Sequence, residues 1–355
     1  MSDVTILVET DVKEEMNQTI NPDFRIYATV SFSDHSLQYT ATIIVNILAT
    51  PISFLSFYLI LRHSKHEKMS YKVYLFASHL SFYLAQLQMG VFGGLVTLNP
   101  FPAVYCQGLL SNYFDAFTLV TFWCFLLCTY AYSAFIMVLI RLQIVARGGK
   151  SFDCKQSYYY IVYGIIAFFV YFPVPGLMFL SRRTPEEMRN FVRLKFPNNL
   201  QVLEHKGIHI FTELDKTSFV NFVMVGTVVG AFGYLVGIYI CIYRATRVHA
   251  IQKSSRHIKE HLRSLYNMII QTTFIGAFMT ISALLILKSF FNDPSVDSRI
   301  SNAIAYSCLC GGSIPSQITM ISRNTAYRNF VLRRKAAYRN STSTQNNRRS
   351  TIVKI

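Results

Sequence analysis

The sequence predicts an all-α membrane protein, a bundle of seven transmembrane helices, and two observations carry this prediction. Charged residues make up 15% of the chain and hydrophobic residues 52%, whereas soluble domains carry about 25% charged residues. The charges are also clustered, which leaves uncharged stretches of 23 to 27 residues at 35–61, 156–181, 217–243, 264–287 and 300–322. About 20 apolar residues cross a bilayer as a helix, so each of these stretches fits one crossing.

A sixth stretch, 73–140, is long enough for two crossings and contains Asp115 as its single charged residue. Its middle holds Asn-Pro-Phe-Pro at 99–102, a combination that favours a turn. We therefore expect transmembrane helices at 37–61, 73–98, 108–140, 157–180, 218–243, 264–287 and 300–321. The chain then divides into an extracellular segment (1–36), the bundle (37–321) and a cytoplasmic part (322–355).

The distribution of Lys and Arg predicts the side that each connecting segment faces. The segments 62–72, 141–156, 244–263 and 322–355 contain 23 Lys or Arg and three acidic residues, whereas the alternate segments contain 11 and 14. An excess of Lys and Arg marks the cytoplasmic side, so we expect the N-terminus outside and the C-terminus inside. This arrangement accounts for the net charge of +16, so the charge does not indicate that the protein binds nucleic acid. Asn17, in an Asn-Gln-Thr sequon, would then be glycosylated.

The segment after the last span predicts a short helix that lies along the inner membrane surface. Tyr327, Phe330 and Val331 recur at i, i+3 and i+4, and Arg328 lies away from them. This pattern suits a helix with its apolar stripe toward lipid and its cations toward anionic headgroups. A solvated basic tail is the alternative.

Four stretches resemble one receptor family in their order and spacing. They are PFPAVYCQGLL (100–110), KFPNNLQVLEHKGIHIF (195–211), LRSLYNMIIQ (262–271) and IPSQITMISRNTAYRNFVLRR (314–334). The chain resembles the nematode serpentine chemoreceptors, which are G-protein-coupled receptors, and is closest to their classes H and I. The resemblance covers about residues 37–335.

This resemblance implies a chemosensory receptor of the plasma membrane, located in the sensory cilium of a chemosensory neuron. The receptor would bind a small molecule in the outer half of the bundle and activate a heterotrimeric G protein through its inner face. Four arginines would face the G protein: Arg141, Arg244, Arg247 and Arg323. The positive-inside charge pattern alone explains these cations equally well. The chain lacks Asp-Arg-Tyr after the third span and Asn-Pro-x-x-Tyr in the seventh, so a rhodopsin-like switch is not transferred residue by residue.

Asp115 is the candidate ligand contact, because it is the single acidic residue inside a predicted span and intramembrane acids are often functional. We expect it about two turns into the third helix, in the outer half, facing a cationic or hydrogen-bonding ligand. Tyr113, Phe117 and Asn221 are expected as walls of the same pocket. The alternatives are a carboxylate that reaches interfacial water and a hydrogen bond buried within the bundle.

Other kinds of site are not indicated. A metal site needs several converging ligands, and His79 is alone in the membrane region. The spans contain no lysine for a retinal Schiff base and no catalytic arrangement, so we expect neither a cofactor nor an enzyme. The remaining alternative is a transporter or channel with seven spans. It would need polar residues along one path, and the charge pattern indicates only Asp115 and His79.

Overall fold

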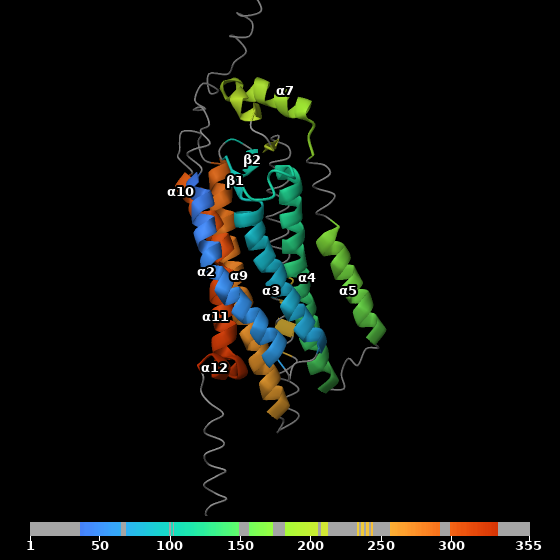
Figure 1. The fold of residues 1–355 in the computed structure, drawn as a ribbon. Helices are drawn as coiled ribbons and strands as arrows, with labels where there is room; N and C mark the ends of the chain where they lie inside the picture. Colours follow the sequence, from blue (N-terminus) through green and yellow to red (C-terminus); the bar gives the residue numbers. More distant parts are fainter. Residues whose placement is uncertain are drawn as a thin grey trace, which may run out of the picture.

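The computed structural model describes residues 36–64, 69–98, 101, 103–148, 156–172, 182–204, 207–211, 233, 236–237, 239–240, 243, 256–291 and 299–332. Long helices dominate this part of the chain and lie side by side with roughly aligned axes (Figure 1). They are α2 (Ser36–His63), α3 (Met69–Leu87), α4 (Ala116–Gly148), α5 (Gln156–Tyr171), α9 (Arg256–Phe291), α10 (Arg299–Gly311) and α11 (Ser313–Arg323).

Three of the described helices are each long and apolar enough to cross a bilayer, over Leu37–His63, Ala116–Arg141 and Tyr266–Ile286. These ranges agree with the first, third and sixth predicted spans. The predicted seventh span consists of α10 and α11, which meet at Gly312. A Cβ at Gly312 would lie 3.0 Å from the Cβ of Phe278, so this junction packs closely against α9. The fifth predicted span falls almost wholly outside the described residues.

Two predicted span boundaries are wrong. The second predicted span extends to residue 98, but α3 ends in a π-helical turn, η3 (Gln88–Phe92), and residues 95–97 form a strand. The third predicted span begins at residue 108, whereas α4 begins at Ala116 and the residues before it form turns. The hydropathy of 108–115 resembles that of a span, and hydropathy alone does not distinguish an apolar turn from a helix.

A small antiparallel sheet caps one end of the bundle, which we call the hairpin end. Its strands are β1 (Leu95–Thr97), β2 (Ala103–Cys106) and β3 (His209–Ile210), in the order β1-β2-β3. Leu95 pairs with Cys106, and Ala103 pairs with Ile210. The strands β1 and β2 flank residues 99–102, where the sequence predicted a turn. The sheet itself was not predicted.

The cap, which consists of α7 (Pro185–Lys195) and the 3-10 helix η4 (Pro197–Glu204), lies beyond the sheet at the hairpin end (Figure 1). The helix α7 begins with a capping box: Thr184 Oγ1 accepts a hydrogen bond from the Glu187 amide at 3.3 Å, and the Glu187 carboxylate accepts one from the Thr184 amide at 2.8 Å. These two bonds satisfy amides that have no partner within the helix.

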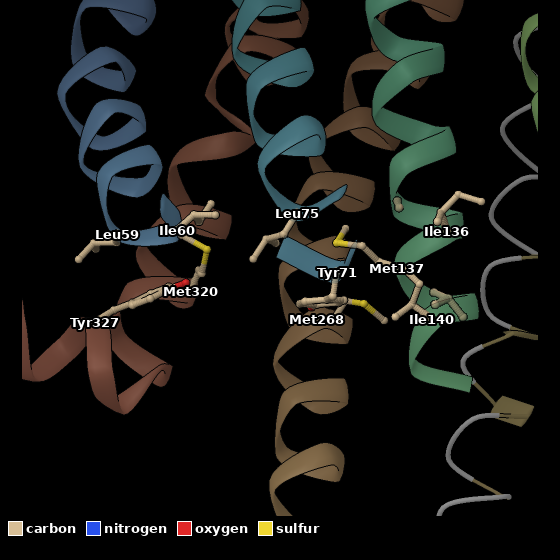
Figure 2. Packing of buried hydrophobic residues seen from close by; sticks show 12 residues of the cluster. Leu59, Ile60, Tyr71, Leu75, Ile136, Met137, Ile140, Met268, Met320 and Tyr327 are labelled. Atoms are coloured by element: carbon tan, nitrogen blue, oxygen red, sulfur yellow. The ribbon is translucent and has the colours of Figure 1, made fainter. Parts of the chain in front are cut away.

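The short helix α12 (Thr325–Val331) lies at the opposite end, the α12 end (Figure 1). It is the helix predicted after the last span, and Asn324 caps it by accepting a hydrogen bond from the Ala326 amide at 3.0 Å. The Tyr327 side chain is buried, whereas Phe330 and Val331 are about 40% exposed. Tyr327 packs into the inner core shown in Figure 2, whose labelled members are Leu59, Ile60, Tyr71, Leu75, Ile136, Met137, Ile140, Met268, Met320 and Tyr327.

The fold thus places the predicted connecting segments at alternating ends. Residues 95–106 and 182–211 are at the hairpin end, and the end of α2, the start of α3 and α12 are at the other (Figure 1). This alternation agrees with the predicted topology. Which end faces the cytoplasm stays a prediction.

Candidate functional site

The strands β1 and β2 are buried on both faces, so they form a plug between the bundle and the cap. Leu95, Val104 and Cys106 pack into a core with α4 and α10. The alternate residues Val96, Ala103 and Tyr105 pack into a second core with Val192, Phe196 and Val202 of the cap. Side chains of a strand point alternately to opposite faces, and here both faces are apolar. The hairpin therefore closes the end of the bundle in two layers.

Asp115 lies at the start of α4 and not two turns inside the helix, so the predicted depth is wrong. Its side chain is exposed and accepts a hydrogen bond from the Thr118 hydroxyl. Tyr113, in the turn before it, is 80% exposed. Neither side chain faces the interior in this conformation, and their role as ligand contacts stays a prediction. Asn221 lies outside the described residues.

Phe117 is the predicted pocket residue that does face inward. It is half-buried against the core beneath the hairpin, and its ring centroid lies 4.8 Å from that of His209 on β3. His209 in turn lies 4.9 Å from the ring of Phe211. The Ala116 amide donates a hydrogen bond to the Gly207 carbonyl at 3.1 Å. These contacts attach the start of α4 directly to the segment that follows the cap.

Cys106 is a buried thiol of the plug. Its side chain is 9% exposed, and all five cysteines that the structure describes are free thiols. Burial raises the pKa of the Cys106 thiol to about 12, and the nearby Asp115 carboxylate adds to the rise. Both effects disfavour the thiolate, so Cys106 behaves as a small apolar residue of the plug.

A line of neutral polar side chains follows the buried face of α2, and the sequence analysis missed it. Its residues recur at helical spacing: Gln38, Thr42, Asn46, Ser53 and Ser56, all at most 3% exposed. Spacings of three, four and seven residues place them on one helix face. That periodicity was the signal available in the sequence, but a search for charged residues does not detect it.

These polar residues connect α2 to the neighbouring helices. Asn46 Nδ2 donates to the Gln86 carbonyl on α3 at 3.2 Å, and Gln86 Nε2 donates to Ser313 Oγ on α11 at 2.7 Å. The turn η3 approaches α2 so closely that a Cβ at Gly90 would lie 2.1 Å from Asn46 Nδ2, and Asn46 would have to shift. Nearer the α12 end, Gln317 on α11 bonds Ser53 on α2.

A small cavity lies next to this line, between α3, α4, α9 and α11. Its volume is about 20 Å³, which is about the space needed by one water molecule. Polar groups from all four helices line it, including His79, Tyr130, Gln271, Thr272 and Ser316. Ser316 Oγ is fully buried and has no hydrogen-bond partner among the described residues. The cavity is thus a neutral polar site inside the bundle.

The α12 end contains two arginines that were predicted to face the G protein. The guanidinium of Arg141 on α4 lies 3.8 Å from the ring centroid of Tyr71 on α3. The guanidinium of Arg323 on α11 lies 4.9 Å from the ring centroid of Tyr266 on α9. Arg141 is 4% exposed, and Arg323 is half-buried. Arg244 and Arg247 lie outside the described residues, as does Asn17.

His79 lines the cavity without companions that could complete a metal site. Within the described ranges, no group of three His, Cys, Asp or Glu side chains lies close enough to hold a metal ion.

The arrangement of the described helices is similar to that of a solved membrane-protein structure. The squid rhodopsin crystal structure superimposes on the chain with a TM-score of 0.56 at 10% identity, and the match covers 88% of each chain. At this identity the likeness shows the fold alone. No curated protein sequence matches the chain.

The profile of the serpentine type 7TM GPCR chemoreceptor family Srh matches residues 33–335. The chain belongs to this family, and the resemblance to nematode serpentine chemoreceptors is confirmed. It is a GPCR-like membrane receptor with a seven-transmembrane bundle.

Proposed function

We propose that this receptor is chemosensory, that it binds a small neutral molecule within the bundle and that it then activates a heterotrimeric G protein. The cavity between α3, α4, α9 and α11 carries the ligand part of this proposal, because it brings hydrogen-bonding groups of four helices to one place. It has room for about one water molecule in this conformation, so a larger ligand binds there only when these helices move apart. We place the receptor in the plasma membrane of a chemosensory neuron, in its sensory cilium.

The chemistry of the interior supports a neutral ligand. The described side chains of the spans between Phe117 and the cavity carry no formal charge at neutral pH, while Asp115 is exposed at the rim. Half-buried apolar residues such as Trp123 and Met279 lie on the hairpin side of the bundle, and Ser, Thr and Gln groups line the cavity. A ligand with an apolar body and one hydrogen-bonding group fits this distribution.

The test is a screen of full-length receptor in cultured cells that carry a G-protein reporter. Matched sets of neutral, cationic and anionic small molecules would be compared, and we expect activation by neutral ones. Gln271→Ala, in the lining of the cavity, should lower the potency of an active compound, whereas Asp115→Asn should leave it unchanged. Activation by a cationic compound that Asp115→Asn abolishes would contradict the proposal and move the ligand to the rim.

Orientation is a separate part of the proposal and has its own experiment. We infer that the hairpin end is extracellular, which would place Asn17 where it can be glycosylated and the arginines of the α12 end beside the G protein. Tags at both termini would be stained in intact and permeabilised cells. The N-terminal tag should stain in intact cells and the C-terminal tag only after permeabilisation, and the inverse result would contradict the inferred orientation.

A transporter or channel would use the polar line along α2 differently. Its residues would face a path through the protein, whereas Asn46, Gln86 and Ser313 are hydrogen-bonded across the contacts of α2, α3 and α11. Ser53 and Gln317 likewise bond each other. These bonds join neighbouring helices, which favours the receptor over the transporter.

A further inference from the structure

The two arginine–tyrosine contacts at the α12 end share one geometry. In each, a guanidinium on one helix lies over a tyrosine ring on the neighbouring helix, Arg141 on Tyr71 and Arg323 on Tyr266. A guanidinium is attracted to the face of an aromatic ring within about 6 Å of its centroid. The contacts therefore join α4 to α3 and α11 to α9. We call each of them a clasp.

Both clasps involve helices that contribute to one packed core. Tyr71 is 5% exposed and packs in the inner core with Ile140 of α4 and Met268 of α9 (Figure 2). Tyr266 precedes Met268 on α9 by two residues and is 55% exposed. A movement of α9 away from α3 and α11 would thus disturb the core around Tyr71 and the clasp at Tyr266 together.

Cations predominate in the segments around the clasps, where Lys and Arg outnumber the acidic residues by 23 to three. The other described cations of this end include Arg62, Lys72, Arg263 and Arg328. Among the side chains that the structure describes at this end, none is Asp or Glu. A surface of this kind attracts an acidic partner. Bidentate arginine–carboxylate bonds are also stronger than an arginine–ring contact, so a carboxylate can displace the tyrosine.

We propose that Tyr71 and Tyr266 hold Arg141 and Arg323 in the resting receptor, and that carboxylates of a docking partner take over both arginines when the helix ends separate. This proposal rests on the proposed function, in which the partner is a G protein. It adds the chemistry of the contact: the partner must present a carboxylate-rich segment, and it binds at the expense of the two clasps.

The first experiment measures whether the clasps hold the helix ends together. Spin labels at Met69 of α3 and Gln143 of α4 would report the distance across the first clasp in full-length receptor in lipid nanodiscs. Labels at Arg263 of α9 and Ser322 of α11, both exposed, would report the distance across the second. Tyr71→Leu and Tyr266→Leu should shift the distances to larger values, whereas Tyr71→Phe and Tyr266→Phe retain a ring and should not. Tyr158→Leu, on the exposed face of α5, is the control.

The second experiment measures the partner chemistry. Synthetic helical peptides that carry several carboxylates, and versions of them with amides in the same positions, would be bound to the same nanodiscs. The acidic peptide should bind more tightly than its amide version, and the leucine variants should bind it about tenfold more tightly. Arg141→Gln combined with Arg323→Gln should abolish the preference for the acidic peptide.

Three results would overturn the clasps: unchanged label distances in both leucine variants, equal binding of the two peptides, or a preference that survives the loss of both arginines. Tyr266 is exposed, so Tyr266→Leu still reports if Tyr71→Leu does not fold. Nucleotide exchange on added heterotrimers separates this proposal from the previous one. If nucleotide exchange is never stimulated but the receptor still prefers the acidic peptide, the proposed function fails and the clasps stand. If exchange is stimulated but the tyrosine variants change neither label distances nor peptide binding, the proposed function stands and the clasps fail.

Discussion

Ser53 and Gln317 are 264 residues apart in the sequence and hydrogen-bond each other inside the bundle. Gln317 Nε2 donates to Ser53 Oγ at 3.0 Å, and the Ser53 hydroxyl lies 3.2 Å from Gln317 Oε1. Both residues are at most 1% exposed. This pair joins the first span to the last, and water has no access to either group. Its loss should therefore affect the stability of the whole bundle.

Gln317→Leu leaves the Ser53 hydroxyl without its partner and should lower the free energy of unfolding by about 1 kcal/mol, because buried polar groups are costly when unpaired. Thermal unfolding of detergent-solubilised receptor would measure the change. Adding Ser53→Ala should restore part of the loss, since both partners are then absent. Ser322→Ala is the control, because Ser322 is exposed and bonds only the Thr319 carbonyl among the described residues. Equal losses in the control and in Gln317→Leu would contradict this assignment.

Gly90→Ala should disrupt the contact between α2 and η3. The added Cβ would lie 2.1 Å from Asn46 Nδ2, so Asn46 must give up its bonds to the Thr42 and Gln86 carbonyls. Overpacking of this kind costs about 1–3 kcal/mol, and cell-surface expression and melting temperature should both fall.

Gly164→Ala is the matched substitution on α5, where a Cβ meets nothing within 4 Å. It should be neutral or slightly stabilising, because alanine favours helix by about 1 kcal/mol over glycine. A similar loss in both variants would show that the Asn46 contact does not decide the result.

Cys106 should resist thiol reagents in the folded receptor. Its pKa is raised to about 12 by burial, and the thiolate is the reactive form, so maleimide labelling at about pH 8 should be slow until the protein unfolds. Tyr113→Cys provides a comparison at the same end, since Tyr113 is 80% exposed, and it should be labelled rapidly. Rapid labelling of Cys106 in the native state would show that the plug opens to solvent.

Tyr327→Phe should loosen α12 without unfolding the bundle. The Tyr327 hydroxyl hydrogen-bonds Ser64 at the end of α2, and both side chains are buried. The phenylalanine ring keeps the apolar contacts with the inner core but leaves Ser64 without this bond, at a cost of about 1 kcal/mol. Hydrogen–deuterium exchange of residues 325–331 should become faster, and exchange in α4 should not change. Unaltered exchange in α12 would mean that the apolar contacts alone position it.

The sequence was sufficient to predict the long apolar helices over Leu37–His63, Ala116–Arg141 and Tyr266–Ile286, because a long uncharged run in a chain this apolar and this poor in charge is typical of a membrane-crossing helix. It was insufficient where an apolar stretch forms a strand or a turn and not a membrane-spanning helix. Residues 95–98 are apolar because both faces of the hairpin are buried. Residues 108–115 form turns whose Leu109, Tyr113 and Phe114 side chains are exposed. Both stretches were interpreted as parts of helices. Asp115 was consequently placed too deep.

The polar residues of α2 show a second limit. Gln38, Asn46 and Ser53 do not interrupt a hydropathy window, since they are neutral, and their partners Gln86 and Gln317 are far away in the sequence. Only the packed structure shows that they meet. The tyrosine partners of Arg141 and Arg323 were hidden for the same reason, whereas the arginines themselves were identified from their position at the ends of spans.

The double burial of the hairpin also constrains the order in which the chain can be assembled. The strands at 95–106 are synthesised well before the cap residues that cover their outer face, Val192, Phe196 and Val202. Until those residues emerge and the fourth span has inserted, an apolar strand surface stays exposed at the end of a partial bundle. Such surfaces promote misassociation. Receptor biogenesis therefore has a vulnerable interval, which closes when the loop after the fourth span folds onto the hairpin.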